Sequence, residues 1–256
     1  ADAVCGKSPS YRIDHLNSII HLIEESGKPS DVLDAQGYYS FNEHVFMANI
    51  QSEIYGRRYT YALLMLLEYK YKDKSEWKDF GTTSIEHILP QNPKATSQWV
   101  KDFSEEQRSY YTHRIGNLCL IGRRKNSSLG NLDYQEKLKK YFEKNIGSFA
   151  SSQKIYQTYP NAWTPETVKE NQERVILDLM EIFGIKSPST IIDDSTYMEQ
   201  QRSVYPNAYQ PWTESDDERL VALYNEGKSI SELAQMFLRN RGAIKSRIHK
   251  LTGERF

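Results

Sequence analysis

The chain has 256 residues, of which 38% are hydrophobic and 26% charged, and its formal net charge is -1. This balance predicts a soluble protein of one large domain or two modest ones, and no apolar run approaches the roughly 20 residues that cross a membrane. Only two cysteines occur, Cys5 and Cys119, which argues against a disulfide scaffold or a thiolate zinc site and favours a reducing cytoplasm.

Residues 1–80 are expected to form a helical support region. Apolar residues recur at helical spacing from His15 to Glu24 and again from Tyr59 to Tyr71. Strand signals follow at Thr82 to Leu89 and at Asn117 to Ile121, with a polar segment between them. The pattern predicts two strands that pack against helices.

Helices are expected again after the second strand. Asp133-x-x-Glu136 has the pattern of a capping box, and Thr164-Pro165-Glu166 is a typical start for a helix that runs to Phe183. The two strands and these trailing helices define a predicted core domain at residues 81–184.

The C-terminal quarter is expected to be a separate unit. Residues 185–211 carry Pro, Asn and Asp with little periodicity, which predicts a linker. Residues 212–256 show three short helical patterns, and the second begins at the capping box Ser229-x-x-Glu232. The predicted fold class is therefore α+β, mostly helical, with a C-terminal three-helix domain.

Polar motifs stand at the ends of the predicted strands. Glu86-His87 ends the first strand, Asn117 begins the second, and Asn126 follows nine positions later. A histidine with its ordinary pKa near 6.5 is neutral at physiological pH and can take a proton from water, so His87 is the candidate base. Glu86 and Asn126 offer oxygen ligands for a hard divalent cation. The Asn117 amide both donates and accepts, so it is expected to tie the inter-strand loop to the strand that holds His87.

In combination these motifs resemble the HNH nucleases of the ββα-metal class, and most of all the nuclease domain at the C-terminal end of GmrSD-type, modification-dependent restriction enzymes. The resemblance covers residues 50–184 and implies a ββα-metal core embedded in helices. It implies a DNA endonuclease with His87 as catalytic base, Asn117 as its brace, and Glu86 and Asn126 as ligands of one metal. Because Asn126 stands where the class has its final histidine, Mg²⁺ or Mn²⁺ is favoured over Zn²⁺.

The resemblance also implies double-stranded DNA as partner, no membrane, and a restriction or anti-phage role against modified or foreign DNA. The family usually carries an N-terminal nucleotide-sensing domain, expected here on a missing segment or a partner subunit. The start at Ala1-Asp2-Ala3, without Met or a signal peptide, predicts a fragment or a trimmed chain. The alternative function is a non-catalytic DNA-binding or regulatory protein with a decayed nuclease fold.

One geometric condition applies to the predicted site. Neighbouring residues of an ideal strand point to opposite faces. Glu86 and His87 therefore converge on one phosphate only if the strand ends or is distorted there, and Pro90 close behind favours such an ending.

Basic residues gather in two stretches. In the core, the candidate phosphate contacts are His113, Arg114, Arg123, Arg124 and Lys137. Residues 212–256 resemble a Myb-like helix-turn-helix domain, whose third helix would enter the major groove with Arg239, Arg241, Lys245, Arg247 and Lys250. Solvated helix faces are the alternative for either stretch, and a protein-docking domain is the alternative for the C-terminal one.

Overall fold

The structure, a computed structural model, describes residues 8–33, 35, 43–72, 82–122, 129–142, 149–186 and 194–254. In these ranges the fold is α+β and mostly helical, and its sheet has two antiparallel strands, β1 (Thr83–His87) and β2 (Leu118–Gly122). Both strands lie at the segments where the sequence carries strand signals, 82–89 and 117–121. In their register Glu86 pairs with Cys119 and His87 pairs with Leu118.

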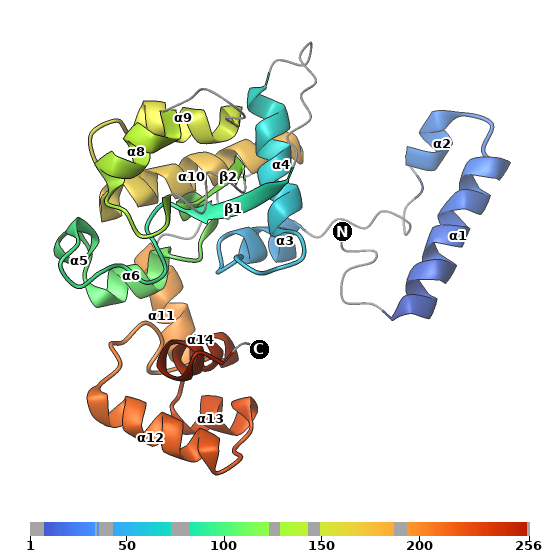
Figure 1. Ribbon diagram of the computed structural model, residues 1–256. Helices are drawn as coiled ribbons and strands as arrows, with labels where there is room; N and C mark the ends of the chain where they lie inside the picture. The colour runs from blue at the N-terminus through green and yellow to red at the C-terminus, as the bar shows by residue number, and fades with distance from the viewer. Residues whose placement is uncertain are drawn as a thin grey trace.

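Helices surround this hairpin on several sides (Figure 1). Those before it are α1 (Pro9–Glu25), α2 (Pro29–Leu33), α3 (Glu43–Ile50) and α4 (Thr60–Tyr71). Between the strands come α5 (Gln98–Asp102), α6 (Glu105–Tyr111) and the 3-10 turn η1 (Ile115–Asn117). After it come α8 (Tyr134–Phe142), α9 (Ala150–Thr158) and α10 (Pro165–Ile182).

Only part of the expected helical support packs on the core. α3 and α4 bury apolar residues in a cluster with Leu118 and Leu120 of β2. α1 buries no residue, and Figure 1 shows α1 and α2 as a pair beside the body. The support predicted for residues 1–80 is therefore supplied by α3 and α4.

The two faces of the hairpin belong to different apolar clusters. Leu118 and Leu120 pack with α4 and α10, whereas Cys119 and Ile121 pack with residues of α8 and α9. This alternation is the period of two expected of a strand buried on both faces. Because Glu86 pairs with Cys119 and His87 with Leu118, the two side chains of the Glu86-His87 motif lie on opposite faces. The convergence that a distorted strand end would allow does not occur.

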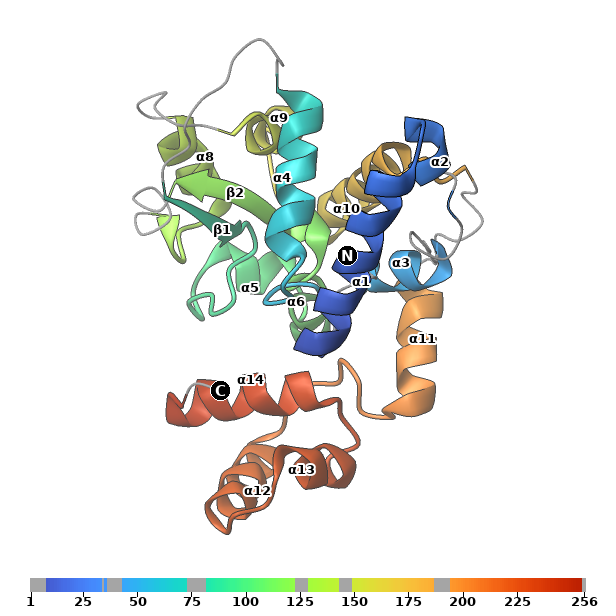
Figure 2. The same ribbon diagram turned by 90° about the vertical axis from the view of Figure 1, so that its right-hand side faces the viewer.

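The C-terminal residues form a compact three-helix unit. Its helices are α12 (Glu214–Asn225), α13 (Ile230–Met236) and α14 (Arg241–Thr252). They enclose a core of their own that includes Leu220, Leu233 and Ile244. Figures 1 and 2 both show these helices grouped apart from the hairpin.

The stretch predicted as a linker, 185–211, is only partly one. It contains α11 (Asp194–Val204), and Tyr197 and Tyr209 are buried in the same cluster as Tyr110 of α6. The aromatic rings, rather than any helical period in the sequence, dock this segment on the body. Among the described residues, no helix is both long enough and apolar enough to cross a membrane.

Candidate functional site

A hydrogen-bonded pair of histidines stands at the end of β1. His87 Nε2 lies 3.2 Å from Nδ1 of His113, which comes from the turn after α6. The other ring nitrogen of His87, Nδ1, lies 3.2 Å from Nε2 of Gln91. His87 is 6% exposed, and His113 is half-buried. His113, predicted as a phosphate contact, is thus also the direct partner of the predicted base; we call the two the histidine pair.

Tyr55 covers the histidine pair from the loop between α3 and α4. Its ring centroid lies 4.2 Å from that of His87, edge-on, and 5.5 Å from that of His113, nearly parallel. The backbone N–H groups of Ile54 and Tyr55 donate to the carbonyl oxygen of His113 at 3.0 and 3.2 Å. Neither Tyr55 nor Gln91 was marked by sequence, because their roles depend on contacts with residues far along the chain or on strand geometry.

Both histidines are held in the neutral form. Burial lowers the pKa of His87 well below 6.5, and the charges of His113 and Lys137 lower it further. Burial alone lowers the pKa of His113 to about 4. Desolvation disfavours the charged form of an imidazole, so at neutral pH both rings are uncharged and able to accept a proton.

Asn117 is fully buried and uses its amide completely. Its Nδ2 donates to the carbonyl oxygens of Leu89 and Thr112, both at 2.9 Å. Its Oδ1 accepts from Leu89 N at 2.7 Å and from Trp163 Nε1 at 3.1 Å. These are the bonds expected of a brace between the inter-strand loop and the end of β1. They fix the backbone two residues beyond His87.

The glycine before Asn117 lets η1 approach α10. A Cβ on Gly116 would lie 2.7 Å from Cα of Gln172, which is closer than real contacts allow. Gly116 N donates to Gln172 Oε1, and Asn171 Nδ2 donates to Gly116 O, both at 2.6 Å. The Gly-Asn dipeptide therefore fits the strand start against one helix and braces the site from the other side.

Glu86 and Lys137 form a buried ion pair on the face opposite His87. Lys137, on α8, is fully buried, and its Nζ lies 2.5 Å from Glu86 Oε1 and 2.7 Å from the carbonyl oxygen of His87. Burial raises the pKa of Glu86, and the charge of Lys137 opposes that shift. Lys137 is therefore not the surface phosphate contact that its position in a basic stretch predicted.

The same pair bears on the predicted metal site. Glu86 already has a cation, the Lys137 ammonium, and it points away from the histidine pair. Asn126, the second predicted ligand, lies outside the described residues, as do Arg123 and Arg124. Within the described ranges no group of three His, Cys, Asp or Glu side chains is placed to hold a metal. Among the described residues, Glu86 is therefore paired with Lys137 and would ligate a divalent ion only after releasing it.

Arg114 is also a structural residue. It is 2% exposed, and its guanidinium carbon lies 4.0 Å from the ring centroid of Tyr110 and 4.4 Å from that of Tyr197. It donates to the carbonyl oxygen of Gln51. Arg114 therefore joins α11 and the 51–55 loop to the core, and it is not available to phosphate as predicted.

The C-terminal cations divide into two groups. Arg239 is 5% exposed, lies 4.1 Å from the ring centroid of Trp212, and donates to Gln210 O and Pro211 O. Arg247 makes two bonds of 2.6 and 2.5 Å to Asp217. These two stabilise the unit rather than project from it. The remaining predicted contacts, Arg241, Lys245 and Lys250, are exposed on α14.

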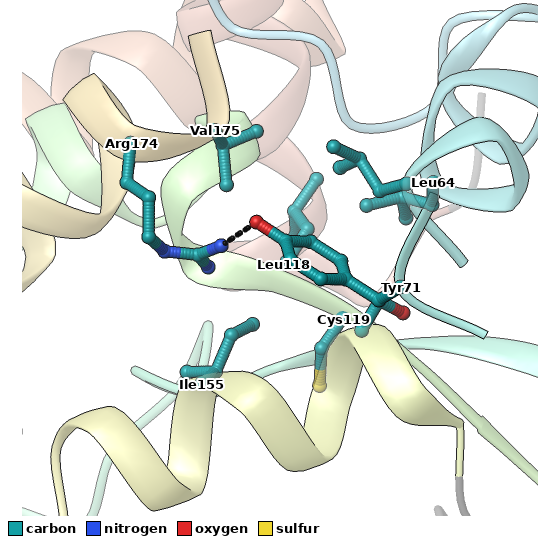
Figure 3. A pocket seen from close by; sticks show the side chains of 9 residues that line it. Leu64, Tyr71, Leu118, Cys119, Ile155, Arg174 and Val175 are labelled. Atoms are coloured by element: carbon teal, nitrogen blue, oxygen red, sulfur yellow. Dashed lines mark hydrogen bonds between the residues drawn. The ribbon is translucent and has the colours of Figure 1, made fainter. Parts of the chain in front are cut away.

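A small apolar pocket lies away from the histidine pair. Figure 3 shows it between α4, β2, α9 and α10, with Arg174 NH1 donating to the Tyr71 hydroxyl at 2.7 Å. None of the nine residues that line it is a histidine. It belongs to the packing of the helices against β2.

The comparisons with known proteins give one family. Residues 42–176 match the model of the family described as GmrSD restriction endonucleases, C-terminal domain. The matched range includes Tyr55, the hairpin, the histidine pair, Asn117 and the Glu86–Lys137 pair. No curated protein and no solved structure matches the chain.

Proposed function

The chain belongs to the GmrSD restriction endonuclease family, and on this basis we propose that it is a DNA endonuclease of HNH type in which His87 is the general base. The observation that carries the proposal is the buried, neutral histidine pair at the end of β1. We place its action in the cytoplasm, in restriction or anti-phage defence. The substrate class, modified or foreign DNA, follows from the family alone.

The pair suits the proton transfer that phosphodiester hydrolysis requires. A water attacking phosphorus must lose a proton, and a neutral imidazole accepts it. His87 Nδ1, which lies 3.2 Å from the Gln91 amide nitrogen, would take the proton from water after the Gln91 amide moves off it. Nε2, which lies 3.2 Å from His113 Nδ1, would then share its own proton with that ring. Tyr55 and Asn117 hold the rings and the strand end, so little reorganisation accompanies the transfer.

A divalent cation, Mg²⁺ first, remains part of the proposal because the resemblance calls for it. When bound, it would stabilise charge on the phosphoryl oxygens as a Lewis acid. Glu86 would have to release Lys137 to contribute a ligand. Loss of cleavage in EDTA would therefore point to a ligand set that includes residues such as Asn126. Full activity in EDTA would leave hydrolysis to the histidine pair.

The C-terminal unit is proposed to bind DNA as a helix-turn-helix domain. The observation in favour is that Arg241, Lys245 and Lys250 are exposed on its third helix. Such a helix enters the major groove in the helix-turn-helix proteins. The buried Arg239 and the paired Arg247 reduce the predicted five contacts to these three.

Plasmid nicking tests the proposed activity. His87→Ala should keep the fold and DNA binding while the rate falls by a factor of about 10²–10⁴. Since the pKa of both histidines is lowered, the parent rate should stay constant from pH 8 to below pH 6.5. A parent chain that binds DNA but never cleaves it, with or without Mg²⁺, would assign the alternative, a non-catalytic DNA-binding protein.

A further inference from the structure

A short exposed turn lies directly beside the histidine pair. It runs from Tyr55 through Gly56 and Arg57 to Arg58, and all four residues are exposed. Gly56 has φ of 80°, a left-handed conformation that glycine adopts without strain. Arg57 N donates to Ile54 O at 2.9 Å, which closes the turn before α4 begins. We call these four residues the 55–58 turn.

The turn is fixed to the site at its base. Tyr55 packs on both rings of the histidine pair, and its N–H donates to the carbonyl oxygen of His113. Glu53 forms an isolated β-bridge with Arg114, the residue after His113. The residues that lead into the turn therefore run alongside 113–114, so the position of the turn is coupled to that of the histidines.

The two arginines at the tip are available to an anion. Among the described residues, neither guanidinium makes a hydrogen bond or an ion pair, although the charge of Arg57 acts on the buried carboxyl of Glu53. By contrast, Arg114 and Lys137, two of the cations predicted to bind phosphate in the core, are buried and paired. Arginine forks match phosphate oxygens, and two adjacent ones concentrate positive charge at the rim of the site.

We propose that the 55–58 turn is the DNA-backbone clamp of the nuclease site, in which Arg57 and Arg58 bind phosphates next to the one presented to the histidine pair. Tyr55 is the positioning residue that holds the turn on the two rings. The inference rests on the proposed function, since Arg57 and Arg58 would bind phosphates of the same DNA strand that is cleaved. The 55–58 turn would make the phosphate contacts in the core that the sequence analysis had assigned to Arg114 and Lys137.

Binding to a fluorescein-labelled DNA duplex, measured by anisotropy across a salt series, tests the clamp. The 256-residue chain with His87→Ala is used so that the probe stays intact. Adding Arg57→Ala and Arg58→Ala should weaken binding by roughly tenfold for each arginine, as for hydrogen bonds between charged groups. The slope of log affinity against log salt should flatten by about 0.9 for each phosphate that the variant no longer binds.

Two further variants make the result specific. Arg57→Lys with Arg58→Lys keeps both charges, so it should retain the salt slope while losing part of the affinity. Lys154→Ala with Lys186→Ala removes two exposed cations from α9 and from just beyond α10, and it should change neither affinity nor slope. Thermal unfolding of each variant should match that of the parent, because all four side chains are exposed.

The outcomes separate the clamp from the proposed function. In cleavage assays with His87 restored, the double alanine variant should raise KM more than it lowers kcat. If the parent nicks plasmid and the double alanine variant keeps its affinity and salt slope, the clamp is overturned and the nuclease assignment stands. If the parent neither binds nor nicks DNA, both fall. Equal binding of an RNA duplex, with the same dependence on the two arginines, would overturn the assignment to DNA.

Discussion

Replacing Lys137 by methionine should destabilise the core strongly, because it removes the only cation that contacts the buried Glu86 among the described residues. Lys137 Nζ lies 2.5 Å from Glu86 Oε1 and 2.7 Å from the His87 carbonyl oxygen, and Glu86 is 5% exposed. Breaking such a pair from one side costs about 3–5 kcal/mol, since a charge stays buried without a partner. At roughly 2–4 °C for each kcal/mol, the melting temperature should fall by roughly 6–20 °C.

The loss should depend on pH in a defined direction. Without Lys137, burial holds the pKa of Glu86 above its ordinary value of 4.5, and only a backbone hydrogen bond at His87 still opposes that shift. The folded state then binds a proton more tightly than the unfolded state, so stability falls as pH rises from the unfolded pKa through the folded one. Urea unfolding of Lys137→Met should therefore show a larger deficit at pH 8 than at pH 5.

A second substitution serves as the control. Glu86→Met in the Lys137→Met background removes the stranded carboxylate and should recover most of the stability, except for the roughly 1–3 kcal/mol from the missing hydrogen bond to the His87 carbonyl. A single Lys137→Met variant that loses less than about 1 kcal/mol, or loses the same at both pH values, would refute the buried ion pair.

Three other predictions concern the brace, the thiol and the C-terminal unit. Asn117→Ala should cost roughly 3 kcal/mol or more in urea unfolding, because it strips the donors from the buried Leu89 and Thr112 carbonyls, and nicking should fall with it. Cys119, with its pKa raised to about 12 by burial, should stay unlabelled by thiol reagents in peptide mass spectra until the protein unfolds. Removing residues 212–256 should lower DNA affinity more than turnover at saturating DNA; an unchanged salt slope would make the unit a protein-docking element.

Local signals in the sequence predicted elements well where the determining contacts are local. The strand signals at 82–89 and 117–121 located both strands, and the capping box predicted at Ser229 is present with Glu232. The similar pattern at Asp133 did not form one. Its carboxylate instead accepts from Gln98 N, 35 residues earlier, at 3.1 Å. The same four-residue pattern thus caps a helix at Ser229 and provides a tertiary contact at Asp133.

Sequence predicted those contacts of the site that depend on residues close along the chain. Asn117 makes the bracing contacts expected of it, because a buried amide that starts a strand has few partners other than the adjoining loop. The direction and the partner of the Glu86 side chain depend on the strand register and on Lys137, which lies 51 residues away. No local pattern in the sequence reveals either. The contacts of Gln91 and Tyr55 with His87 depend on how the hairpin and the loop before α4 pack around it, so no sequence pattern predicts them.

Charge was the least reliable guide, and the reason is physical. A lysine or arginine in a basic stretch is equally able to face solvent or to neutralise a buried acid, stack on rings and cap carbonyls. Lys137, Arg114 and Arg239 are buried, so cations available to phosphate have to lie elsewhere. On the described surface near the histidine pair, the adjacent exposed arginines are those of the 55–58 turn, which lies just before the helical pattern predicted from Tyr59. A nuclease built this way would use its most obvious cations to hold the catalytic strand and leave phosphate binding to a neighbouring turn. Phosphate contacts should then be sought at exposed cations beside the base, not at those nearest to it in sequence.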